Sequence, residues 1–284
     1  MTTPLLCEEC GYPVPLSANT CPHCGRPGMF PNVKAAKVST EVDALNKRYK
    51  TAQVDAANRG ISDVLKDFED AALTSHAVIA RPFDEVFRLA SGDNQLYATY
   101  YGLLEGGIKL PTGEKWDKLR ALTDDAMFPN YKEQIRFASL SLDEIGLSNY
   151  GEYSIVLRDD MIEHRATVFE ENSVMFMKKH DIKIWEAVNL PPGYRATWPS
   201  RNRLCVAKLY RQLDVDTQPD QYLEIISKQG TTSDEDEFVE VHIYGTMTVR
   251  TIKKVTLTSR PKGASRIGAL KAKLDKFGVS FVEK

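Results

Sequence analysis

Four cysteines near the start of the chain have the spacing of metal ligands. They form two Cys-x-x-Cys pairs, Cys7 with Cys10 and Cys21 with Cys24, and ten residues separate the pairs. Four thiolates complete the tetrahedral coordination that structural zinc sites use. A segment this short buries too little apolar surface to fold without its metal, so the spacing predicts a structural zinc site.

The cysteine pattern resembles a zinc ribbon over roughly residues 5–28. Ribbons bind nucleic acid, bind protein or cap a neighbouring domain, and the sequence leaves these three roles open. The fifth cysteine, Cys205, lies on the apolar side of a helix expected at 204–213, where it is expected to be a core thiol. Four clustered cysteines and one isolated cysteine are not a disulfide framework.

A second stretch with chemical potential runs from Asp234 to Val255. Its residues Phe238–Ile243 alternate between apolar and polar types, which predicts a strand with one buried face. Glu240 and His242 share the polar face of that strand. A carboxylate held on a rigid strand can be a catalytic group, but an exposed edge strand with its polar residues in solvent explains the same pattern.

Composition excludes several classes of protein. At 284 residues the chain can form one large domain or two of ordinary size. The net charge of −2 argues against a protein that grips nucleic acid over its whole surface. No apolar run of about 18 residues occurs, which predicts no membrane span. Residues 1–6 lack the basic and long apolar regions of a signal peptide, so we expect a cytoplasmic protein.

Between the cysteines and the rest of the chain, a helical pattern extends from about Thr40 to Leu73 and is interrupted at Gly60. Its apolar stripes allow either a homodimer through this connector or packing on the downstream domain. A helix is also expected at 95–105, capped by Asp93 or Asn94. The polar run at 170–173 can reach a pocket or can form the surface of a helix.

Downstream of the connector, three expected strands carry polar groups that could bind a ligand. One strand ends in Arg81, a second contains Ser139 and Ser141, and the last contains Glu240; Tyr150 precedes a further strand. This order resembles the ADP-ribosyltransferase superfamily over about residues 75–284. The resemblance implies that Glu240 is catalytic and that Arg81, Ser139, Ser141 and Tyr150 hold NAD, which is a substrate.

The resemblance also implies a fold. We expect an α+β protein with a zinc ribbon at 1–30, a helical connector at 31–74 and a catalytic domain at 75–284, the last built on a mixed α/β arrangement with a split antiparallel sheet. Two departures from the family stand out. Phe238 occupies the position where arginine-modifying members have a second Glu or Gln, and residues 96–99 compete with Arg81 as the first cofactor-binding motif.

The sequence therefore favours an NAD-dependent ADP-ribosyltransferase, such as a bacterial toxin or an anti-phage defence effector. Its acceptor would be a nucleic acid or a protein residue other than arginine. A partner protein that neutralises the activity would also fit a toxin or defence effector. The alternative is a non-enzymatic zinc-ribbon module that binds nucleic acid or protein.

Overall fold

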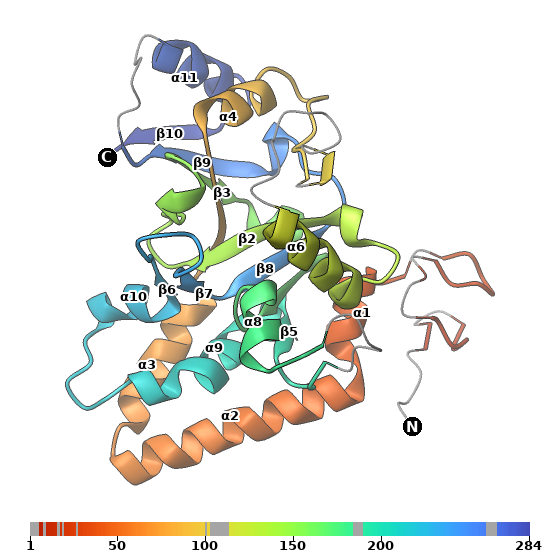
Figure 1. Ribbon diagram of the computed structural model, residues 1–284, viewed down its shortest axis with the longest axis vertical. Coiled ribbons are helices and arrows are strands. Elements are labelled where there is room, and N and C mark those ends of the chain that lie inside the picture. Colours follow the sequence, from red (N-terminus) through yellow and green to blue (C-terminus); the bar gives the residue numbers. More distant parts are fainter. Residues whose placement is uncertain are drawn as a thin grey trace.

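The computed structural model describes residues 6–7, 10–15, 18, 20–26, 28–99, 101–102, 114–183, 190–259 and 266–284, with the backbone alone for 114–117. Its centre is an eight-stranded sheet in the order β10-β9-β3-β1-β2-β8-β4-β5 (Figure 1). The strands in chain order are β1 (His76–Arg81), β2 (Ile135–Ser141), β3 (Tyr153–Leu157), β4 (Ala166–Phe169), β5 (Arg195–Thr197), β8 (Glu240–Tyr244), β9 (Ile252–Leu257) and β10 (Ser280–Glu283).

Neighbouring strands of this sheet are antiparallel except β9 and β10, which are parallel. The prediction of a mixed α/β protein with a mostly antiparallel sheet is therefore confirmed. We expected a split sheet, whereas these eight strands form one continuous hydrogen-bonded sheet. A separate two-stranded ribbon pairs β6 (Ser227–Lys228) with β7 (Glu237–Phe238).

The helices surround this sheet on both faces. The α-helices are α1 (Pro31–Lys37), α2 (Ser39–Arg59), α3 (Ser62–Leu73), α4 (Phe83–Leu89), α6 (Glu114–Met127), α7 (Asp159–Ile162), α8 (Ser173–Lys179), α9 (Arg201–Leu209), α10 (Tyr222–Ile226) and α11 (Ile267–Asp275). Short 3-10 helices are η1 (Lys132–Gln134), η2 (Ser148–Tyr150), η3 (Trp198–Ser200), η4 (Tyr210–Gln212), η5 (Pro219–Gln221) and η6 (Val249–Thr251). Of the helices in the described ranges, none is both long and apolar enough to cross a membrane.

The predicted break in the connector lies between α2 and α3. Gly60 adopts a left-handed conformation with φ of 70°, and its N–H bonds to the carbonyls that end α2. Both helices pack against α9, so packing on the downstream domain accounts for their buried stripes. Two residues of the predicted stripes, Val42 and Val54, remain 39% and 61% exposed. The homodimer stays a prediction.

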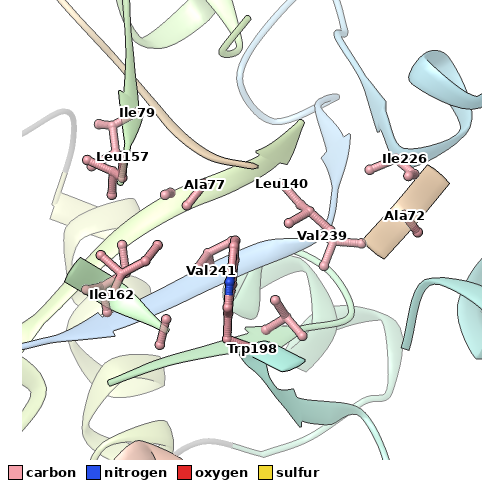
Figure 2. Packing of buried hydrophobic residues seen from close by; sticks show 14 of the residues in the cluster. Ala72, Ala77, Ile79, Leu140, Leu157, Ile162, Trp198, Ile226, Val239 and Val241 are labelled. Atoms are coloured by element: carbon pink, nitrogen blue, oxygen red, sulfur yellow. The ribbon is translucent and has the colours of Figure 1, made fainter. Parts of the chain in front are cut away.

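One face of the sheet forms the main hydrophobic core. Val241 of β8 and Val239, which directly precedes that strand, pack there with Leu140 of β2, Trp198 of η3 and Ala72 of α3 (Figure 2). The lone thiol Cys205 is fully buried in the same core, as predicted. This face is closed by α2, α3 and α9, which cross below the sheet in Figure 1.

The opposite face of β8 is buried as well. His242 contacts three aromatic rings, those of Phe128, Phe137 and Phe169, and is 3% exposed. Helices α6 and α8 pack together over this face. The alternative of an exposed edge strand is therefore wrong, because β8 lies between β2 and β4 and both of its faces are covered.

The helix expected at 95–105 does not include residues 95–99, whereas residues 101 and 102, which the structure also describes, are helical. Residues 95–99 have no regular secondary structure, and Tyr97 N donates to Met247 O across the molecule at 2.8 Å. Asp93, the expected cap, instead forms an ion pair with Arg250. The remaining expected residues include 103–105, which lie outside the described part of the chain.

Candidate functional site

The four clustered cysteines converge in the structure. Their sulfur atoms all lie within 4.8 Å of one another. The Sγ–Sγ distance is 3.7 Å between Cys7 and Cys24 and 3.6 Å between Cys10 and Cys21. Tetrahedral zinc with Zn–S bonds of about 2.3 Å requires sulfur atoms about 3.8 Å apart. The cysteine segment (residues 6–26) therefore has a donor set that fits a metal ion, compatible with a zinc ribbon.

Tight turns position these thiols. Gly11 N donates to Cys7 O and Gly25 N donates to Cys21 O, and both glycines have φ near 70°. Hydrogen bonds from the backbone N–H groups of Cys24 and His23 lower the pKa of Cys21 to about 6. The pKa of the neighbouring Cys10 thiol shifts in the opposite direction, so the cysteines titrate as a coupled set, and the thiolate is the form that binds metal.

Glu240 is the centre of a second, buried cluster. It is 2% exposed, and donors approach both of its carboxylate oxygens. Oε2 accepts a hydrogen bond from Ser173 N at 3.1 Å and lies 2.8 Å from Nε2 of His242. Because an ionised carboxylate can only accept, Nε2 of His242 carries the hydrogen. Oε1 lies 3.6 Å from Nη1 of Arg120.

Arg120 is shared between two carboxylates. Its Nε lies 3.1 Å from Oδ2 of Asp124, one turn later in α6, and its guanidinium stacks 3.9 Å above the ring of Phe137. Asp124 also accepts a hydrogen bond from Tyr101 Oη at 2.8 Å. The arrangement joins α6 to β8 through a buried ion pair, which compensates the charge of Glu240 away from water.

The environment displaces the pKa values of the two carboxyl groups in opposite directions. Burial opposes ionisation of Glu240, but the charge of Arg120 and the hydrogen bonds from His242 and Ser173 outweigh it and lower the pKa of Glu240. Burial raises the pKa of Asp124, and Arg120 offsets this only in part. Such a pair keeps one carboxylate ionised while the other holds a proton more readily.

Two of the predicted site residues lie close to Glu240. Ser139 is its register partner on β2, so the two side chains share one face of the sheet, and Ser139 Oγ donates to Val78 O at 3.2 Å. Tyr150 ends η2, and burial together with the charges of Asp236 and Glu240 raises the pKa of its phenol. Tyr150 is 36% exposed, so it lies at the surface and within electrostatic reach of Glu240.

The other two predicted residues lie elsewhere. Ser141 Oγ donates to Oδ1 of Asp143 at 2.8 Å, in the turn that leaves β2. The β1–β2 register pairs Val78 with Ser139. Alternation along β1 therefore places Arg81 on the face opposite Ser139 and Glu240. There Arg81 forms an ion pair with Glu85 and stacks on Tyr97.

The run at 170–173 reaches the cluster, one of the two alternatives that its sequence allowed. Asn172 caps α8 by accepting hydrogen bonds from two backbone amides, which turns Ser173 N toward Glu240. Ser173 Oγ and Asp124 Oδ1 are buried without a hydrogen-bond partner among the described residues. The cluster therefore has hydrogen-bonding capacity left for a bound polar group.

Sequence reasoning missed Arg120, Asp124 and His242 as partners of Glu240. The spacing of Arg120 and Asp124 is a common helix pair, so it carried no signal of its own. His242 lies two residues after Glu240 on the same strand face, and that spacing could have identified it.

Comparison with known proteins does not place the chain in a family. No protein-family model matches the sequence, and no curated protein matches it significantly. Arguments about function therefore rest on the geometry of the two clusters.

Proposed function

We propose that this protein is an NAD-dependent ADP-ribosyltransferase in which Glu240 is the catalytic residue, and that its cysteine segment is a structural zinc ribbon. The observation that carries the proposal is the environment of Glu240: an ionised carboxylate held on a central strand by Arg120, His242 and Ser173. Fixed charges of this kind stabilise positive charge that develops in a transition state.

Three further observations support the proposal. The strands that carry the three expected motifs, β1, β2 and β8, are consecutive neighbours in the sheet. Ser139 lies directly beside Glu240, and Tyr150 is within electrostatic reach of it. Arg120, and not Arg81, is the cation next to Glu240, so we assign Arg120 the role of binding an anionic part of NAD.

In the proposed reaction, the bond between C1′ of the ribose and the nicotinamide nitrogen breaks. The bonding electron pair leaves with nicotinamide, and positive charge develops on the ribose carbon. Glu240 stabilises that charge while the acceptor attacks C1′, and the proton of the acceptor is released to solvent. Arg120 and His242 keep the carboxylate ionised and fixed in position, and Tyr150 lies where it can stack on nicotinamide.

The test is nicotinamide release from NAD, followed by chromatography. Glu240→Gln should lower the rate by about a hundred-fold or more, the usual cost of removing one preorganised electrostatic group. Glu237→Gln is the matched control, because Glu237 is an exposed glutamate in β7. Circular dichroism and zinc content should be the same in all three proteins.

Equal release by wild type and Glu240→Gln contradicts the role of Glu240. Absence of release by the wild type, together with no NAD-dependent rise in melting temperature, contradicts the enzyme altogether. That result would favour the binding module, and the salt dependence of nucleic-acid affinity would then be measured.

A further inference from the structure

The helix that follows the cysteine segment is tied to the strand that carries Glu240. Asn32, in the first turn of α1, is 3% exposed. Its Nδ2 donates to Arg165 O at 2.9 Å and to His242 O at 3.1 Å. These carbonyls belong to adjacent chain segments at β4 and β8, so one side chain bridges the two strands. The residue whose backbone it holds, His242, is the residue whose ring contacts Glu240.

The same helix is tied to the cysteine segment by a buried charge. Lys34 is 1% exposed, and its ammonium group donates to Ala18 O and, at 3.4 Å, to Pro15 O. Both carbonyls belong to the stretch between the two cysteine pairs. Burial lowers the pKa of Lys34. A buried ammonium group is tolerated only when hydrogen-bond acceptors replace the water around it. The carbonyl groups that do so for Lys34 are in place only when the cysteine segment is folded.

The peptide that joins these two parts is packed as well. The Phe30 ring lies 5.1 Å from the Tyr244 ring, at the end of β8, and 5.8 Å from the His164 ring. Helix α1 itself contacts β4, β5 and β8, and Figure 1 shows it between the cysteine segment and the sheet. Contacts thus run without a gap from the metal ligands through α1 to Glu240.

We propose that Asn32 is a positioning residue for Glu240 and that the metal-bound cysteine segment holds it in place through Lys34. Metal loss unfolds a segment that has almost no apolar core of its own, which removes the carbonyl partners of Lys34. The first turn of α1 then loses its anchor, and the end of β8 around His242 loosens. Metal occupancy would in this way regulate the Glu240 cluster; the catalytic consequence rests on the proposed function, whereas the coupling does not.

The test is amide hydrogen exchange on the full chain, with bound zinc and after chelation. In the wild type, chelation should speed exchange at 242–244 by about ten-fold or more, while exchange in α3 and α11 stays unchanged. Asn32→Ala with zinc bound should already exchange fast at 242–244, and chelation should change it little. Asn58→Ala, on the exposed side of α2, is the matched control and should behave like the wild type.

Lys34→Met separates the two links, because it keeps the aliphatic stem and removes the ammonium. It should retain zinc, already exchange fast at 242–244 with zinc bound, and lose the response of 242–244 to chelation. Asn32→Asp has the shape of asparagine without its donors. Its exchange at 242–244 should be as fast as in Asn32→Ala if the hydrogen bonds donated by Asn32 hold the strand. Exchange as slow as in the wild type would show that packing of the side chain is sufficient.

Two outcomes overturn the inference: exchange that changes only within residues 6–30 on chelation, or an Asn32→Ala protein with the same zinc response as the wild type. Nicotinamide release is followed in the same samples. If the wild type releases none but the exchange response occurs, the proposed function fails and the coupling stands. If release does not depend on zinc although the exchange response occurs, metal occupancy does not regulate catalysis, and only the structural coupling stands.

Discussion

The cysteine segment and the Glu240 cluster are both sites of concentrated polar chemistry, but they are built in opposite ways. The four cysteines come from one short segment, and Cys10 and Cys24 are exposed. The Glu240 cluster combines β8 with α6 and with the first residue of α8, and Glu240 is almost entirely buried. The first site has a donor set that could hold a metal ion and, on our proposal, stabilises its chain through it, whereas the second is held together by the chain around it.

The difference indicates what each site will tolerate. A metal site in short turns depends on ligand number, so loss of one thiolate is decisive there, and the surrounding residues matter less. In a buried ion pair each charge needs its partner, because the partner replaces the interactions with water that were lost on burial. Removal of one charge therefore leaves the other buried without a substitute for water. Three experiments can break or sharpen this comparison.

The largest effect is expected at the cysteine segment. Cys24→Ser should abolish stoichiometric zinc binding, because three thiolates no longer close the tetrahedral site, and should expose residues 6–26 to protease. Zinc content by atomic absorption and limited proteolysis measure both effects. Cys205→Ala is the control and should keep its zinc, since Cys205 lies in the core. Retention of one zinc ion by Cys24→Ser would contradict the four-thiolate site.

The next effect is expected at Arg120. Arg120→Met keeps much of the packing over Phe137 but leaves Glu240 and Asp124 without their cation, which should destabilise the protein by about 3–5 kcal/mol. Denaturant unfolding measures the change. Arg250→Met removes an arginine from an exposed ion pair with Asp93 and should have little effect. A similar decrease in unfolding free energy in both variants would show that the buried ion pair stabilises the protein no more than the exposed one.

The smallest effect concerns acid stability. Because the pKa of Glu240 is lowered in the folded protein, its contribution is present above about pH 4.3, the value for an unperturbed glutamate, and is lost as pH falls through the folded pKa. The free energy of unfolding of Glu240→Gln should therefore fall less than that of the wild type when the pH is lowered from about 6 to about 3. Denaturant titrations at the two pH values measure the difference.

Glu144 provides the surface counterpart. Burial opposes its ionisation, but hydrogen bonds from Lys253 and Lys254 lower the pKa of Glu144 to about 2. Its contribution should disappear as the pH falls from about 4.3 through the folded pKa of about 2, and high salt should weaken it. The contribution of Glu240 should be less sensitive to salt, because only 2% of this residue is exposed. Equal salt sensitivity would contradict the burial of the Glu240 cluster.

Local pattern was sufficient for several elements. The alternation at 238–243 placed Glu240 and His242 on one face and the aliphatic residues on the other, as the structure has them. The break at Gly60 followed from a backbone preference that acts within a few residues. The expected start of the helix at 95–105 was wrong, because Tyr97 N bonds to a distant carbonyl instead of one four residues away, and within this range helical residues are described only at 101–102.

The sequence by itself determined the cluster of four cysteines, because thiols at this spacing need only short turns to converge. It determined equally that Glu240 faces away from the aliphatic side of its strand. Only the tertiary structure decided that this polar face is buried, that Arg120 compensates Glu240, and that Arg81 lies on the opposite face. A strand pattern fixes which residues share a face, but what covers that face depends on elements far away in the sequence, since α6 and β8 meet only through folding.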